Sequence, residues 1–200
     1  VTSIGFYAFY CCSSLTNIEI PDGITSIGED AFEECSGLTY NEYDNAYYLG
    51  NSNNLYIALV GVKSTDITSC EIHEKTKLIV GSAFWYCENL TSIEIPEGVI
   101  SIGAYAFGYC SSLTSIEIPN SVTSIGEYAF WYCENLTSIE IPDNVTSIGD
   151  MAFQGCSGLT TITFNGTVEE WNAIEKGYDW NFNVPATEVV CSDGRVALRV

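Results

Sequence analysis

A unit of 23 residues recurs along this chain and restricts its fold more than any other feature. Residues 116–119, with the sequence IEIP, return as residues 139–142. The pair Ala-Phe recurs with the repeat, at Ala8-Phe9, Ala31-Phe32, Ala83-Phe84, Ala106-Phe107, Ala129-Phe130 and Ala152-Phe153. Such self-similarity indicates a solenoid, in which each unit buries its apolar face against its neighbours.

Each unit predicts two extended pieces and one turn. Residues 115–118 alternate polar and β-branched apolar side chains, which is typical of a short strand, and Pro119 ends it. Residues 122–125 form a second, weaker extended piece, after which Gly126 allows a change of direction. Residues 129–133 then predict a single helical or 3₁₀ turn on the opposite side. Strands of successive units are expected to stack in parallel and in register, roughly 4.8 Å apart.

One unit is irregular. Residues 44–68 lack the A-F-x-x-C turn and offer two apolar stretches, Ala46–Leu49 and 55–60, about a polar turn. This pattern predicts a β-hairpin that projects from the solenoid, and insertions of this kind often carry specificity in repeat proteins. We therefore expect a solenoid over residues 1–164, with the hairpin insertion at about residues 44–68.

Residues 165–200 predict a C-terminal cap, because the repeat pattern stops after Phe164. Thr167 and Glu170 have the spacing of a helix capping box, and residues 188–191 and 195–198 read as a hairpin. A cap covers the open end of a solenoid. At the other end the chain opens in mid-repeat, which predicts that it is an excised piece.

The charge balance excludes several kinds of partner. The chain has 26 acidic and 6 basic residues, a formal net charge of −20. Nucleic-acid binding needs basic residues that neutralise phosphates, and an anionic membrane surface would repel this chain. No apolar stretch is long enough for membrane insertion. The negative charge would attract basic partners or metal cations. We expect an acidic extracellular protein.

The unit I-x-x-I-G-x-x-A-F-x-x-C-x-x-L-T-x-I-x-I-P resembles the repeat of BspA-type leucine-rich-repeat proteins, over almost all of residues 1–164. The resemblance implies a leucine-rich-repeat solenoid: a curved, right-handed stack with a parallel sheet on the concave face and short turns opposite. It also implies a bacterial cell-surface or secreted protein that acts in adhesion or ligand capture, without catalysis or cofactors. The chain departs from the family pattern at the hairpin, at Val80 in a glycine position and at Asn41 in an isoleucine position.

A row of glutamates is the first candidate binding feature. If the isoleucines of each strand face the core, the glutamates between them face outward and align. The residues concerned are Glu19, Glu42, Glu71, Glu94, Glu117 and Glu140. They form either a solvated acidic face or a surface that binds Ca²⁺ or a basic partner. EF-hand spacing and glycine-aspartate calcium repeats are absent, so we predict no dedicated metal site.

Aromatic residues on the turn side are the second candidate. They are Trp85, Tyr86, Tyr109, Trp131 and Tyr132. Exposed, they would bind sugar rings or another protein; otherwise they pack along the ridge between units. Six cysteines share one position of the repeat, which predicts a column of buried thiols, although neighbouring units could approach disulfide distance.

No catalytic arrangement can be drawn from these residues. His73 is the single histidine, stands in the proline position of the irregular unit and is expected to be structural. We therefore expect a non-catalytic protein-interaction module that binds a protein or glycan of a host or neighbouring cell. The alternatives are a carbohydrate-binding module or a spacer within a larger surface protein.

Overall fold

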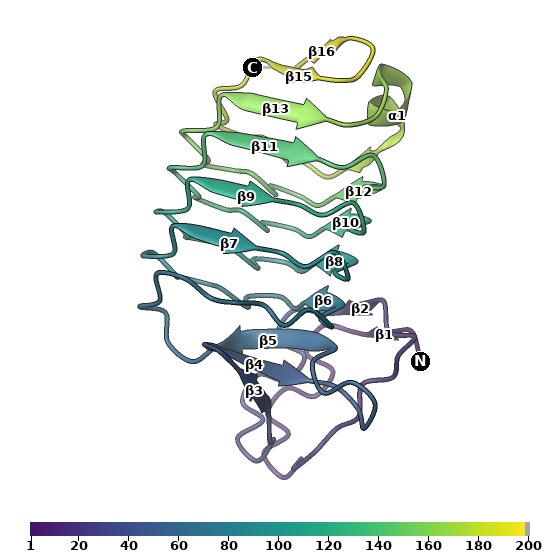
Figure 1. Ribbon diagram of the computed structural model, residues 1–200, viewed down its shortest axis with the longest axis vertical. Helices are drawn as coiled ribbons and strands as arrows, with labels where there is room; N and C mark the ends of the chain where they lie inside the picture. Colours follow the sequence, from purple (N-terminus) through teal and green to yellow (C-terminus); the bar gives the residue numbers. More distant parts are fainter. Residues whose placement is uncertain (199–200) are drawn as a thin grey trace.

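The computed structural model describes residues 1–198, and it shows a stack of rungs formed by the repeats (Figure 1). Two parallel sheets run along the stack, and the one helix within the described residues is α1 (Val168–Ala173). The predicted leucine-rich-repeat solenoid is therefore confirmed.

The glutamate sheet is built from the IEI segments. Its strands pair in parallel and in register, so that Ile93 lies beside Ile116 and Ile139 beside Ile162. These isoleucines are buried, whereas the residues between them face solvent. The repeat strands are β7 (Ser92–Glu94), β9 (Ser115–Glu117), β11 (Ser138–Ile141) and β13 (Thr161–Phe164).

The serine sheet is built mainly from the TSIG segments, on another side of each rung, with β6 and β14 in the same positions. Ile102, Ile125 and Ile148 point into the core, and the serine before each of them lies on the outward face. Its parallel strands are β6 (Leu78–Ile79), β8 (Ser101–Ile102), β10 (Ser124–Ile125), β12 (Ser147–Ile148) and β14 (Glu175–Lys176).

The Ala-Phe segments form successive hydrogen-bonded turns instead of the helical turn that the sequence predicts. Tyr105 and Tyr109 of one rung have φ angles of 56° and 57°, in the left-handed region, which interrupts a helix. The backbone N–H of Phe107 donates to the carbonyl of Ala129 on the next rung at 2.8 Å. The turns thus add a third line of hydrogen bonds along the stack, and the buried phenylalanine rings stack beneath it.

The inserted hairpin does not project from the solenoid, as the sequence analysis expects. Its strands β4 (Ala46–Leu49) and β5 (Ala58–Val62) are antiparallel, and β5 pairs in parallel with β6 of the serine sheet. The short strand β3 (Asn41–Tyr43) extends the sheet beyond β4. Tyr48 packs into one core cluster and Leu49 into a second, so apolar residues on both faces of the hairpin bind it into the molecule.

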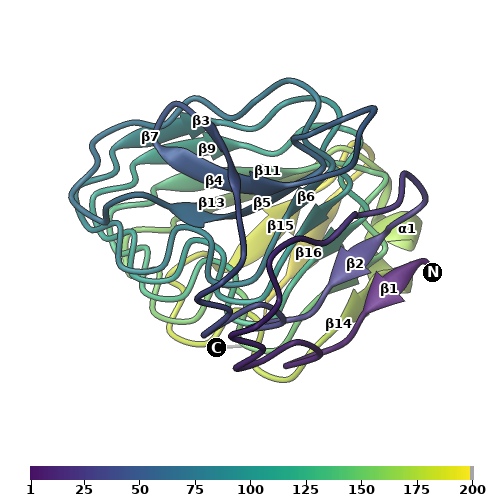
Figure 2. The ribbon, with the colours of Figure 1, turned by 90° about the horizontal axis from the view of Figure 1, so that it is seen from below.

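The N-terminal unit, residues 1–40, packs beside the main stack around a second core that it shares with the hairpin and β6. Its strands β1 (Ser3–Ile4) and β2 (Ser26–Ile27) form a separate two-stranded sheet. This sheet lies beside β6 in Figure 1, and the view from below shows it on the same side of the molecule as β14 (Figure 2). Ile27 and Phe32 are in a cluster with Leu78 and Val80 of the main stack. Val80, in a glycine position of the repeat, is buried in this cluster.

The C-terminal cap closes the other end of the stack. Thr167 and Glu170 form the predicted capping box of α1, and Trp171 of the helix is buried. Strand β15 (Glu188–Val190) pairs with β13, and β16 (Arg195–Ala197) pairs antiparallel with β15. Arg195 also forms an ion pair with Glu188.

Candidate binding surfaces

Three of the six predicted glutamates form a row on the outward face of the glutamate sheet. Glu94, Glu117 and Glu140 are partners in the strand register, and their side chains are exposed. Strand spacing places neighbouring carboxylates about 5 Å apart, where they repel each other by about 0.8 kcal/mol in bulk water. The side-chain amide of Asn165 donates to Glu140 Oε1 at 2.8 Å.

The row does not extend to all six glutamates, so the prediction of a six-membered row is wrong: Glu19 and Glu42 lie elsewhere, and Glu71 precedes Glu94 without strand pairing. Glu42 belongs to β3 of the serine sheet and makes a 2.7 Å ion pair with Lys63. Glu19 belongs to the N-terminal unit, beside the second core instead of the main stack. Glu71 stands on the rung before Glu94, outside any strand, and accepts a hydrogen bond from the Tyr43 hydroxyl. The irregular unit changes the path of the chain and so breaks the alignment.

A polar groove of about 730 Å³ opens where the glutamate sheet meets this irregular rung. Within the described residues, no backbone hydrogen bond joins residues 70–72 to β7, and the Glu71 N–H donates instead to Asp44 Oδ2 at 2.8 Å. His73 stacks on Tyr56 with ring centroids 3.8 Å apart, which gives it the structural role expected for it. The hydrogen bond to Glu71 raises the pKa of Tyr43, which also lines the groove.

The aromatic residues of the turns pack against one another. The rings of Tyr86, Tyr109 and Tyr132 form a ladder, with centroids 4.6 Å and 5.3 Å apart and nearly parallel planes. Trp85 and Trp131 stack at 5.8 Å, although they are two rungs apart. On the rung between them the same repeat position is Gly108, and a Cβ on Gly108 would stand 2.2 Å from the Trp85 ring. The missing side chain leaves the space in which the two indole rings meet.

This packing limits what the aromatic residues offer to a ligand. Sugar binding uses the flat face of a ring, and the parallel rings of the ladder cover one another's faces. Tyr86 remains 45% exposed, whereas Tyr109, Trp131 and Tyr132 are half-buried. The indole nitrogen of Trp131 has no hydrogen-bond partner in residues 1–198, and rings of neighbouring tyrosines surround it.

The repeated cysteines form a column of thiols behind the turns. All nine cysteines of the chain are free. The thiol of Cys110 donates to the carbonyl of Phe84 on the preceding rung at 3.3 Å, and the thiol of Cys133 to Phe107 at 3.1 Å. Burial raises the pKa of the Cys87 thiol to about 12, so it stays protonated at neutral pH. The column is therefore a structural element.

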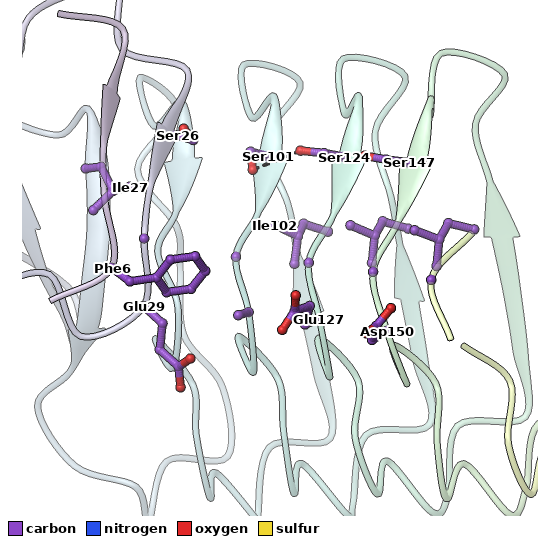
Figure 3. A pocket seen from close by; sticks show the side chains of 18 of the residues that line it. Phe6, Ser26, Ile27, Glu29, Ser101, Ile102, Ser124, Glu127, Ser147 and Asp150 are labelled. Atoms are coloured by element: carbon purple, nitrogen blue, oxygen red, sulfur yellow. Dashed lines mark hydrogen bonds between the residues drawn. The ribbon is translucent and has the colours of Figure 1, made fainter. Parts of the chain in front are cut away.

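A second groove, of about 580 Å³, lies between the N-terminal unit and the outward face of the serine sheet. Figure 3 shows the serines of β8, β10 and β12 along one side of it and three carboxylates, of Glu29, Glu127 and Asp150, along the other. We call it the serine groove. Sequence reasoning missed these residues because it predicts one continuous stack, in which no unit faces this sheet. Leu78 and Val80, apolar in positions of serine and glycine, were the available signal.

Residues 1–198 hold neither a metal-binding cluster nor a membrane-spanning helix. They contain no group of three or more histidine, cysteine, aspartate or glutamate side chains placed to hold a metal ion. They also contain no helix with the length and apolar character that crossing a bilayer requires.

Several solved bacterial structures are similar to this chain. A leucine rich cell surface protein of Faecalibacterium prausnitzii A2-165 is 32% identical, with a TM-score of 0.58, over 88% of this chain and 54% of that one. A leucine-rich repeat protein of Bacteroides capillosus ATCC 29799 is 25% identical, with a TM-score of 0.55, over 64% of this chain and 99% of that one. The pneumococcal vaccine antigen PcpA shares the fold at 20% identity and a TM-score of 0.63, over 96% of this chain and 49% of the antigen.

The chain therefore spans about half the length of the Faecalibacterium and pneumococcal proteins. Among curated proteins, none matches it. The BspA type leucine rich repeat region matches in six copies, over residues 1–53 and 62–174. This chain belongs to the BspA-type leucine-rich repeat family.

Proposed function

We propose that this chain is a non-catalytic protein-interaction module of a bacterial cell-surface or secreted protein, and that it captures a basic partner on the glutamate sheet. The observation that carries the proposal is the in-register row of Glu94, Glu117 and Glu140. The paired strands β7, β9 and β11 hold this row on a rigid backbone, so binding would order little of the chain. The Faecalibacterium relative is named a cell surface protein, which supports the location.

The chemistry of the row favours a partner that itself presents cations at strand spacing. Neighbouring strands repeat about every 4.8 Å, so lysines or arginines on adjacent strands of a partner sheet would each meet one carboxylate. Each pair would relieve the mutual repulsion of the glutamates as well as adding its own attraction. Net charge of −20 would also accelerate encounter with a basic surface at low ionic strength.

A charge-matched pair of variants tests the proposal. In the test variant Glu94, Glu117 and Glu140 become glutamine; in the control the exposed turn residues Glu88 and Glu134, together with Glu97, become glutamine. Both lose three negative charges, so long-range attraction changes equally. We would measure binding by interferometry to immobilised, purified cell-surface and matrix proteins that range from acidic to basic.

We expect the unchanged chain to bind the basic proteins, with an affinity that falls as salt rises, and the test variant to bind at least about tenfold more weakly than the control. Equal binding by the two variants would refute capture by the glutamate sheet. Binding to a glycan array that neither variant alters would favour the carbohydrate-binding alternative.

A further inference from the structure

The serine groove is a second open surface, distinct from the glutamate sheet. Its floor is the outward face of β8, β10, β12 and β14, and the N-terminal unit forms its wall. Phe6 of that unit lines the groove and is 62% exposed (Figure 3). Phe6 and the small residues of the floor make the surface of this groove mainly apolar.

The floor continues a packing surface that the protein already uses. At β6 the N-terminal unit covers this face of the sheet through Leu78 and Val80. At β8, β10 and β12 the same positions hold serine and glycine, whereas Glu175 takes the serine position at β14, and the face is open (Figure 3). The glycines themselves are explained by the stack, because a Cβ at Gly126 would lie 2.6 Å from the backbone of Gly103 and Ala104. The flat floor is therefore a consequence of the repeat, and the N-terminal unit turns it into a groove.

One side of the groove carries three carboxylates, of which Asp150 accepts a hydrogen bond from the backbone N–H of Tyr178 at 2.7 Å. Glu29, Glu127 and Asp150 lie along it. Burial, Asp30 and the nearby Glu127 raise the pKa of Glu29. Lys176 is the one basic residue among the described residues that line the groove, and its Nζ donates to the carbonyls of Trp171 at 2.6 Å and Ile174 at 2.8 Å.

We propose that the serine groove docks an extended, lysine- or arginine-bearing peptide segment of a partner protein. The four strands of the floor span roughly 14 Å, the length of about four extended residues. Alternate residues of such a segment would be small and would face the floor, because serine and glycine leave no deep pocket there. The residues between them would extend cationic side chains to Glu29 and Glu127.

Charge complementarity and shape together select this occupant. A hydrophobic helix is about 10 Å wide and would leave the carboxylates desolvated without cations. An acidic or phosphorylated segment would be repelled by the same carboxylates. An extended basic segment can cover the apolar floor and, at the same time, place cations beside the carboxylates along the rim, Glu29, Glu127 and Asp150.

The probe for a test is a fluorescein-labelled hexapeptide, Ala-Lys-Gly-Lys-Ala-Lys, with a second peptide in which glutamate replaces lysine. Fluorescence anisotropy would be measured for the unchanged chain, for a rim variant with Glu29→Gln and Glu127→Gln, and for Ser124→Phe, which fills the floor. The glutamine variant of Glu94, Glu117 and Glu140 serves as the control for the glutamate sheet. Thermal melting would establish that each variant is folded.

We expect the lysine peptide to bind and the glutamate peptide not to bind. The rim variant should weaken binding between about threefold and tenfold, and Ser124→Phe should weaken it at least as much. The glutamate-sheet control should lose less than about twofold, so this result stands whether or not the proposed function holds. Absence of binding up to about 1 mM peptide, or a loss confined to the glutamate-sheet variant, would overturn the serine groove as a docking site.

Discussion

Thr76 should make this protein less stable than a valine would. It occupies the repeat position that holds valine in the next three units, at Val99, Val122 and Val145. Like Val99 and Val122 it is 0% exposed, and its Oγ1 has no hydrogen-bond partner among the described residues. A buried hydroxyl without a partner costs roughly 1–3 kcal/mol relative to solvent, and valine has nearly the same shape.

We therefore expect Thr76→Val to raise the free energy of unfolding by about 1–2 kcal/mol. For a chain of this size each kcal/mol corresponds to about 2–4 °C in melting temperature. Urea unfolding and thermal melting, followed by circular dichroism, would measure both quantities. The matched control is Thr123→Val, because Thr123 is exposed and its hydroxyl already donates to the carbonyl of Ile100 at 3.2 Å.

The control should be neutral or slightly destabilising, since it removes a satisfied surface hydroxyl. A loss of stability in Thr76→Val would refute the reasoning, because it would show that the buried hydroxyl has a partner such as an internal water.

Three further perturbations have defined outcomes. Gly108→Ala should destabilise the chain by about 1–3 kcal/mol and change its tryptophan fluorescence, because the new methyl displaces the Trp85 ring; an unaltered spectrum would contradict the packing. A thiol reagent should modify the exposed Cys11 and Cys12 rapidly in the native protein and all nine cysteines in denaturant; rapid native reaction of more than two would contradict the buried column. Because the pKa of Glu29 is raised, its proton binds more tightly in the native state, so stability should fall as pH rises from its unfolded pKa through its native pKa. Glu29→Gln should flatten that part of the stability–pH curve, and an unchanged curve would contradict the assignment.

The regular part of the fold follows from the repeat. Ile116, Phe107 and Cys110 recur with the period and are buried as it predicts, because each unit meets an identical neighbour. The same symmetry predicts that Glu94, Glu117 and Glu140 align, and they do.

The irregular part could not be predicted in the same way, because it depends on contacts between segments without a common period. Tyr48 and Leu49 look like one strand of a free hairpin, yet they enter two different cores. Val80 is visible in the sequence as an exception, but the repeat does not place the N-terminal unit against which it packs. The position of Glu42 follows from the same rearrangement, since β3 joins the serine sheet.

The hairpin between the two cores has a consequence for how such a chain can change its length. It fixes the N-terminal unit to β5 and β6, and the cap fixes the far end to β13. Duplication of a rung between these ends, for example that of β9 and β10, would preserve every contact at both junctions. It would move the cap by about 4.8 Å and add one glutamate to the row and one serine to the groove. The number of middle rungs therefore determines the length of both surfaces, and with it the length of the partner segment that each can bind.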